Sequence, residues 1–102
     1  MPVNARVHQP DGILHGGASV ALAETVGSFA AALSINRKTH AVRGIEISAN
    51  HLKSIREGLI TATAIALHRG RTTQLWEIRI VDEEEDLISL CKLSTMVIAK
   101  KS

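Results

Sequence analysis

The chain has 102 residues, which fits one small domain spanning residues 1–102. Apolar residues make up 45% of the sequence but aromatic residues only 2%, so the core has to be built from Ala, Val, Ile and Leu. A formal net charge of +2, with the basic residues in scattered pairs, argues against a nucleic-acid-binding surface. The single cysteine excludes an intrachain disulfide and favours a reducing compartment, so we expect a cytoplasmic protein without a signal peptide or membrane span.

The first predicted element is a helix over residues 16–34. It follows a polar segment over residues 1–12 that carries both prolines and indicates extended chain or turn, with no independent element. Residues 16–34 are rich in alanine, too long a run for a strand and apolar on nearly every side. Such a helix is typical of the middle of a core, and we expect it to be buried all round.

Four strands follow, predicted over residues 42–52, 59–67, 72–81 and 87–99. One helix followed by a four-stranded antiparallel meander predicts an α+β fold in which a curved sheet wraps the helix. The two outer strands leave sheet edges open to another chain, and the architecture therefore predicts a dimer.

Glu24 is the one formally charged residue between Asp11 and Arg37, in the middle of the predicted helix. A carboxylate carried into an apolar core usually has a raised pKa and is poised to act as a base. The alternative is an ordinary helix glutamate that faces solvent or pairs with an arginine. Ser28 lies one turn further on and shares the face of Glu24, so it either belongs to the same site or bonds its own backbone.

Gly16 and Gly17 place unencumbered backbone N–H groups at the start of the helix, where the partial positive charge favours anions. These groups could form an oxyanion hole, although a tight turn explains two glycines equally well. His15 is a ligand, a proton donor or a loop-packing residue. Gln9 either hydrogen-bonds a carbonyl group or is an ordinary loop residue.

The spacing between Gly16 and Glu24 constrains any shared role. Eight residues of helix span about 12 Å, at about 1.5 Å per residue. One chain cannot bring both residues to one carbonyl group. If both act, we expect one to come from each of two subunits, with the site at a dimer interface.

Several motifs run along the chain: Gln9-Pro10-x-Gly12-x-Leu14-His15-Gly16-Gly17-Ala18-Ser19, Leu22-Ala23-Glu24-Thr25-x-Gly27-Ser28, Gly44-Ile45-Glu46-Ile47-x-Ala49-Asn50-His51, Arg56-Glu57-Gly58 and Gln74-Leu75-Trp76-Glu77-Ile78. Together they resemble the hot-dog-fold thioesterases of the phenylacetic-acid-degradation type. Within that family the chain is similar to the branch that hydrolyses 1,4-dihydroxy-2-naphthoyl-CoA, 4-hydroxybenzoyl-CoA and related aroyl-CoA esters. The resemblance covers nearly the whole chain, without the N-terminal helix and first two strands usual in the family.

The resemblance implies a role for each matching residue. Glu24 matches the catalytic carboxylate, as nucleophile or as base for water, and Gly16 matches the residue whose N–H polarises the thioester carbonyl. Gln9, His15 and Ser28 match supporting positions. Contacts to the CoA ester are implied for Gly44, His51, Leu52, Lys53, Ser54, His68, Arg69, Gly70, Arg71, Thr72 and Thr73.

The basic residues among these positions could hold the phosphates of CoA, although solvated surface charge is the plain alternative for each of them. Coenzyme A enters only as part of the substrate, so no cofactor is expected. No metal site is expected either, because the five histidines show no ligand spacing. We therefore expect an acyl-CoA thioesterase, with an aroyl substrate, that works as a homodimer or a tetramer. The alternatives are a non-catalytic assembly or acyl-CoA-binding module and, less favoured by the residues present, a dehydratase of acyl carriers.

Overall fold

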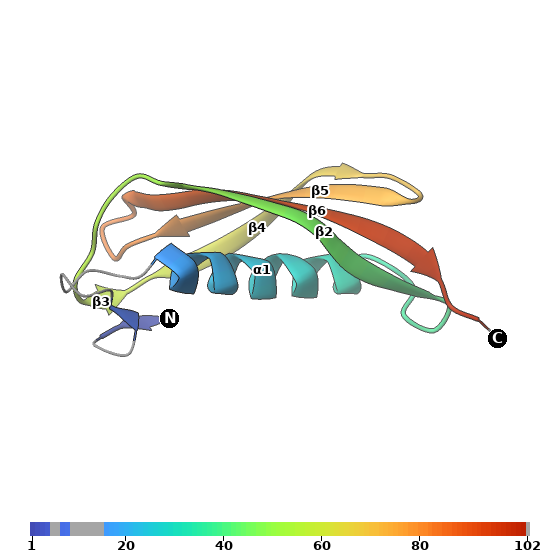
Figure 1. The fold of residues 1–102 in the computed structure, drawn as a ribbon, viewed down its shortest axis with the longest axis horizontal. Helices are drawn as coiled ribbons and strands as arrows, with labels where there is room; N and C mark the ends of the chain where they lie inside the picture. The colour runs from blue at the N-terminus through green and yellow to red at the C-terminus, as the bar shows by residue number, and fades with distance from the viewer. Residues whose placement is uncertain (5–6, 9–15, 102) are drawn as a thin grey trace.

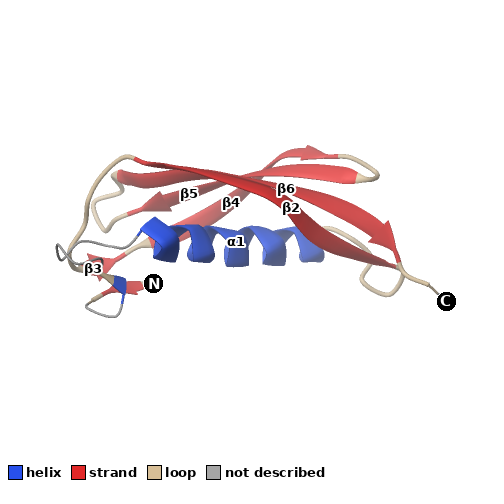
Figure 2. Ribbon diagram, in the orientation of Figure 1, coloured by secondary structure: helices blue, strands red, loops and turns tan. Residues whose placement is uncertain are grey.

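The computed structural model describes residues 1–4, 7–8 and 16–101 as one helix and six strands. Figure 1 shows the helix lying along one face of a curved antiparallel sheet, and Figure 2 shows the same arrangement by element type. In chain order the elements are β1 (Pro2–Val3), α1 (Gly16–Leu33), β2 (His40–His51), β3 (Gly58–Leu59), β4 (Thr61–Arg69), β5 (Thr73–Val81) and β6 (Leu87–Ala99). This is the predicted α+β fold, with a central helix wrapped by a curved sheet.

The helix α1 ends where the alanine-rich run meets a polar turn. The amide of Ser34 donates to the carbonyl of Ala31 at 3.1 Å, and the amide of His40 donates to the carbonyl of Asn36 at 2.9 Å. This turn reverses the chain into β2, so that β2 runs back along the helix (Figure 1). As a result, the end of β2 lies beside the start of α1.

The main sheet has the strand order β2-β6-β5-β4, all antiparallel. The predicted meander is therefore correct for β4, β5 and β6 but wrong for β2, which pairs with the last strand instead of with its neighbour in sequence. Residues 52–57 carry the chain from the β2 edge to the opposite edge (Figure 1). Gly58, the first residue of β3, follows with φ of 100°, in the left-handed region that favours glycine, and the chain continues through Ile60 into β4.

The core lies between α1 and the sheet. Apolar residues at every second position of β5 and β6 predict that one face of each strand is buried. In the structure Trp76, Ile78 and Ile80 of β5 are buried, as are Cys91 and Leu93 of β6, which confirms this prediction. Burial raises the pKa of the Cys91 thiol, because the thiolate would lose its hydration.

Close packing of helix on sheet depends on Gly27. A Cβ atom at this position would lie 2.8 Å from Cδ2 of Leu93 and 3.1 Å from Cδ1 of Ile78. A side chain at this position would have to push Leu93 and Ile78 aside, so Gly27 helps α1 to approach the sheet closely.

A buried polar cluster ties the end of α1 to the sheet. The side-chain amide of Gln74 donates to Oγ of Ser34 at 2.9 Å. Its Oε1 accepts from Nε1 of Trp76 at 3.0 Å and from Oγ1 of Thr95 at 3.2 Å. Every side-chain polar atom of Gln74 is thereby bonded, which offsets the cost of burying it.

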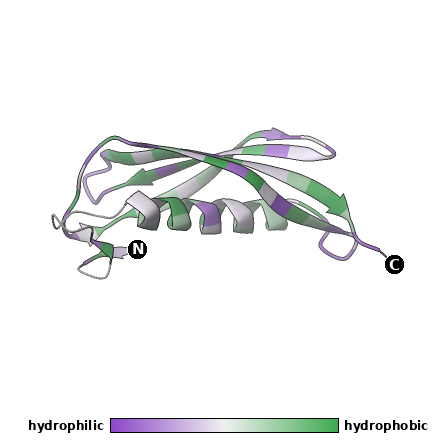
Figure 3. Ribbon diagram, in the orientation of Figure 1, coloured by the Kyte–Doolittle hydropathy of each residue, from purple (hydrophilic) through white to green (hydrophobic). Residues whose placement is uncertain are grey.

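The helix is not buried all round, contrary to the expectation from its composition. Its buried residues are Ser19, Ala23, Gly27 and Ala31, which share the face turned to the sheet. Phe29 and Leu33 are 64% and 56% exposed. Figure 3 shows a mostly pale or hydrophobic helix with one hydrophilic turn, and a single chain covers only one side of it. In length and composition α1 would also pass as a membrane span, but it packs along the sheet.

The first residues are extended, as expected, but they are also paired with another segment of the chain. They form the short strand β1, which pairs with β3, and the terminal ammonium of Met1 donates to the carbonyl of Ile60 at 2.7 Å. Val3 is buried in the core cluster. The N-terminal residues thus belong to a second, two-stranded sheet.

Candidate active site

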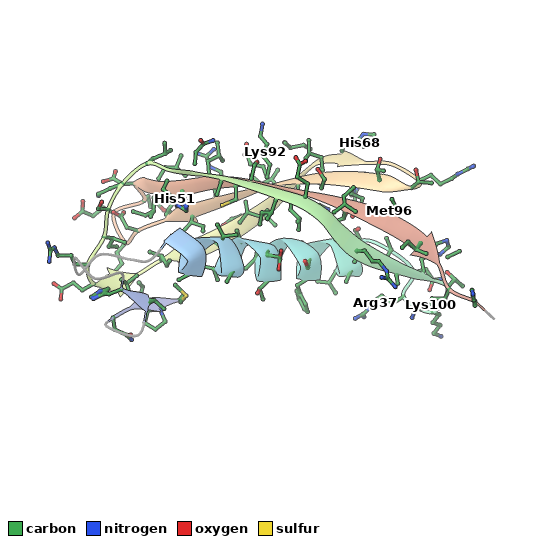
Figure 4. The ribbon with its side chains drawn as sticks, in the orientation of Figure 1. Arg37, His51, His68, Lys92, Met96 and Lys100 are labelled. Carbon is green, nitrogen blue, oxygen red and sulfur yellow. The ribbon has the colours of Figure 1, made fainter. Side chains whose placement is uncertain are left out.

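Gly16 is the first residue of α1 and lies against the ring of His51, the last residue of β2. A Cβ atom on Gly16 would be 3.1 Å from Nε2 of His51. Gly16 therefore lets the imidazole approach the helix N-terminus, where the first N–H groups have no partner within the helix. Figure 4 labels His51 at this end of the molecule. The structure brings together two predicted site residues that lie 35 positions apart in the sequence.

Ser89 of β6 completes this group. His51 and Ser89 are register partners in the pairing of β2 with β6, and Nδ1 of His51 lies 2.9 Å from Oγ of Ser89. Sequence reasoning missed Ser89. The sequence did offer one indication of it. Ser89 lies two residues before Cys91, so its hydroxyl is on the same face of β6 as the buried Cys91 and Leu93.

Glu24 and Ser28 lie together further along α1. They line an open pocket of about 700 Å³, and its other lining residues are Thr25, Val26 and Phe29. Glu24 is exposed, so the prediction of a carboxylate inside an apolar core is wrong for the single chain. The sheet covers the opposite face of the helix, and the pocket is open where the predicted core would have continued.

The predicted separation of Gly16 from Glu24 follows from the regular helix. Both residues belong to α1, with two turns of helix between them. Gly16 lies beside the sheet edge at His51, whereas Glu24 faces the open pocket. Within one chain the two residues do not meet.

The predicted CoA-contacting stretches are also apart. Residues 51–54 begin at the last residue of β2, at the end of the sheet near the start of α1. Residues 68–73 form the hairpin between β4 and β5 at the other end, where Figure 4 labels His68. In that hairpin the amide of Gly70 donates to the carbonyl of Thr73 at 2.8 Å, and the carbonyl of Thr72 accepts from Val97 at 2.8 Å. Gly44 lies between these ends, at the irregularity in the pairing of β2 with β6.

Lys53 is bound by two carboxylates of its own chain. Its Nζ lies 2.8 Å from Oδ2 of Asp82 and 2.8 Å from Oδ2 of Asp86, in the loop between β5 and β6. The hydrogen bond to Asp82 is the largest cause that raises the pKa of the Lys53 ammonium, and it lowers the pKa of Asp82. Glu57, Glu83 and Glu84 line the same shallow pocket. This surrounding negative charge weakens the case for a phosphate at Lys53.

Two predicted site residues, Gln9 and His15, lie outside the described residues. Among the residues that are described, no three His, Cys, Asp or Glu side chains are placed to hold a metal ion. The candidate residues that the structure describes therefore include two groups on α1: Gly16 with His51 and Ser89, and the pocket with Glu24 and Ser28.

Comparison with known proteins gives a consistent result. A family model described as the thioesterase superfamily matches residues 11–89. A 1,4-dihydroxy-2-naphthoyl-CoA hydrolase of Listeria monocytogenes is 50% identical over 101 residues, covering 99% of this chain and 80% of that protein. A protein of Vibrio cholerae is also 50% identical, over 95% of this chain, but the chain spans only 64% of its length. The crystal structure of a variant thioesterase from Pseudomonas aeruginosa superposes with a TM-score of 0.95 at 43% identity, covering 98% of this chain and 72% of that one.

Proposed function

Because the chain belongs to the thioesterase superfamily, a family of thioester hydrolases, we propose that it hydrolyses an acyl-CoA to the free acid and CoA. One observation carries the proposal: Glu24, the sole charged residue of α1, lines an open and largely apolar pocket beside Ser28. Such a pocket can hold an acyl group against a carboxylate. The name of the Listeria relative favours an aroyl group, for which Phe29 and Val26 offer apolar contacts.

Glu24 has two possible roles in the reaction. As a base it takes a proton from water, whose oxygen adds to the thioester carbon. As a nucleophile it bonds to that carbon itself, and water then opens the resulting anhydride. In both cases the C–S bond breaks, the sulfur takes up a proton, and one water is consumed for each acid and thiol released.

The N–H of Gly16 is proposed to polarise the carbonyl and to stabilise the negative charge that builds on its oxygen. Since Gly16 and Glu24 of one chain face different surroundings, the complete site needs Glu24 from a second copy. Two features support such a homodimer: the uncovered face of α1 and the free outer edge of β2. Two dimers could pair further into a tetramer. Gln9 and His15 keep their proposed supporting roles next to Gly16.

The CoA portion is proposed to leave the site along His51, which lies against Gly16, and along Leu52 and Ser54, which come after His51 in the chain. Lys53 contributes less than its charge suggested, because Asp82 and Asp86 already neutralise it. Gly44 and residues 68–73 lie further along the sheet. They would therefore contact only a CoA molecule that is bound at the site of another copy.

Glu24→Gln tests the assignment directly. The substitution keeps the shape of the side chain but removes the base and nucleophile, and we expect turnover of aroyl-CoA esters to fall by at least about a thousandfold. Release of CoA thiol is measured on a panel of aroyl- and alkanoyl-CoA esters, with circular dichroism as the check of folding.

Glu84→Gln is the matched control, because Glu84 is an exposed carboxylate of the loop between β5 and β6. It should keep the wild-type rate. Activity retained in Glu24→Gln would contradict the role of Glu24. A wild-type chain that binds CoA esters without hydrolysing any of them would instead indicate the non-catalytic module.

A further inference from the structure

The buried hydroxyl of Ser89 has a defined partner in the ring of His51. Ser89 is 1% exposed, and Oγ lies 2.9 Å from Nδ1 of His51. The two residues face each other in the ladder between β2 and β6, so the backbone pairing sets this approach. The far side of the same ring, at Nε2, meets Gly16 at the start of α1.

The direction of this hydrogen bond decides which ring nitrogen carries the proton. A buried hydroxyl has to donate its proton to an acceptor, because water cannot reach it. Within the described part of the chain, Nδ1 of His51 is the partner found for this hydroxyl. If the hydroxyl donates, Nδ1 is the unprotonated nitrogen, and the proton of the neutral ring lies on Nε2.

We propose that Ser89 is a positioning residue for the hydrolysis: its hydroxyl donates to Nδ1 and holds His51 as the tautomer with Nε2–H, turned toward the N-terminus of α1. The proposal rests on the proposed function for its role in turnover. In this proposal the His51 ring donates a hydrogen bond from Nε2. It neither transfers a proton nor binds a phosphate.

With this tautomer, one subunit supplies two hydrogen-bond donors for the thioester oxygen. The N–H of Gly16 and the Nε2–H of His51 lie at the same helix end, where the helix dipole also favours negative charge. Both can donate to the thioester oxygen as it becomes negative, while Glu24 of the other copy acts on the carbon. Without the Ser89 hydroxyl nothing fixes Nδ1, so the ring is free to rotate and its Nε2–H is no longer held toward the helix end.

The test combines a spectrum with kinetics on the full chain. Long-range proton–nitrogen correlation spectra of ¹⁵N-histidine-labelled protein distinguish the two tautomers of His51, and a His51→Gln sample assigns the signals. We expect the Nε2–H pattern in the wild type, with the Nδ1 resonance shifted upfield by the hydrogen bond that it accepts, and loss of that shift in Ser89→Ala. Ser89→Cys, a weaker donor of nearly the same size, should retain part of the shift.

In turnover of an aroyl-CoA ester, Ser89→Ala should lower kcat about tenfold with KM changed less than twofold, because the group acts on the developing charge. His51→Leu should lower kcat on the order of a hundredfold. In the His51→Leu background, Ser89→Ala should cost nothing further, which separates positioning from a general loss of packing.

An Nδ1–H pattern in the wild type, or an unchanged Nδ1 resonance in Ser89→Ala, would overturn the proposal. So would an equal loss of kcat from Ser89→Ala in both backgrounds. The spectrum needs no turnover, so a wild-type chain that fails to hydrolyse any ester counts against the proposed function, and the tautomer still decides the proposal for Ser89.

Discussion

At the scale of single residues, the surroundings of a charge decide what it can do. Lys53 carries the charge expected of a phosphate ligand, but Asp82 and Asp86 each lie 2.8 Å from its Nζ. The sequence could show the lysine and the acidic loop, yet their contact depends on how residues 52–57 cross the end of the sheet. For Glu24 the expectation was burial, and the fold leaves it exposed. Its isolation in the sequence was visible, whereas its exposure depends on which face of α1 the sheet covers.

Lys53→Met should make the free energy of unfolding depend less on pH in the acidic range. The pKa of Asp82 is lowered in the folded chain, so this carboxylate stabilises the fold above its ordinary value of 3.8 and loses that effect as the pH falls below it. The variant should therefore unfold at lower urea concentration than the wild type at pH 7, and the difference should shrink below about pH 4.

Lys101→Met is the control, since Lys101 is exposed near the end of the chain, and it should match the wild type at every pH. The same difference between Lys53→Met and wild type at pH 3 and pH 7 would show that the ion pairs contribute no stability. High salt should also reduce the difference, because the side chains of Lys53 and Asp86 are open to solvent.

At the scale of elements, prediction succeeded where local pattern is strong. The bounds of β6, residues 87–99, were predicted correctly, and the buried row of Trp76, Ile78 and Ile80 was visible from alternation alone. The neighbour of β2 was not predictable in this way. Pairing between β2 and β6 joins residues far apart in sequence, and its register contains an irregularity near Gly44 that a simple alternation does not show.

Gly27→Val tests the packing of α1 on the sheet. The added side chain would have to displace Leu93 and Ile78, both fully buried, so we expect a loss of about 1–3 kcal/mol in the free energy of unfolding. Urea unfolding measures this loss. Ala21→Val, at an exposed position of the same helix, reports the cost of a β-branched residue in a helix alone. Equal losses in the two variants would mean that Gly27 is not a close contact.

At the scale of the whole molecule, the chain is one helix on one sheet, with the second side of the helix uncovered. The expectation that this apolar helix lies inside a core was reasonable from composition. It fails for one chain because the described residues supply only one covering layer. Both the dimer and the cytoplasmic location stay predictions, as does the sharing of a site between copies.

Mixing two inactive variants tests the shared site. In a heterodimer of Glu24→Gln with Gly16→Val, one of the two sites would combine an intact Glu24 with an intact Gly16. Random pairing after joint refolding should then restore about a quarter of the wild-type activity. Each variant alone should be inactive, the second because a side chain at Gly16 collides with His51.

No recovery from a mixture shown by light scattering and mass spectrometry to contain the heterodimer would place both groups within one chain. Refolded wild type, treated in the same way, supplies the reference rate. A mixture of Glu24→Gln with itself, prepared with two different tags, controls for the exchange of subunits.

The cluster around Gln74 has an optical consequence. Trp76 is the only tryptophan in the sequence and there is no tyrosine, so nearly all near-ultraviolet emission comes from one indole. That indole is 6% exposed and donates to Gln74, whose amide in turn holds Ser34 at the end of α1. Its emission wavelength therefore reports, without any label, whether the helix is still seated on the sheet.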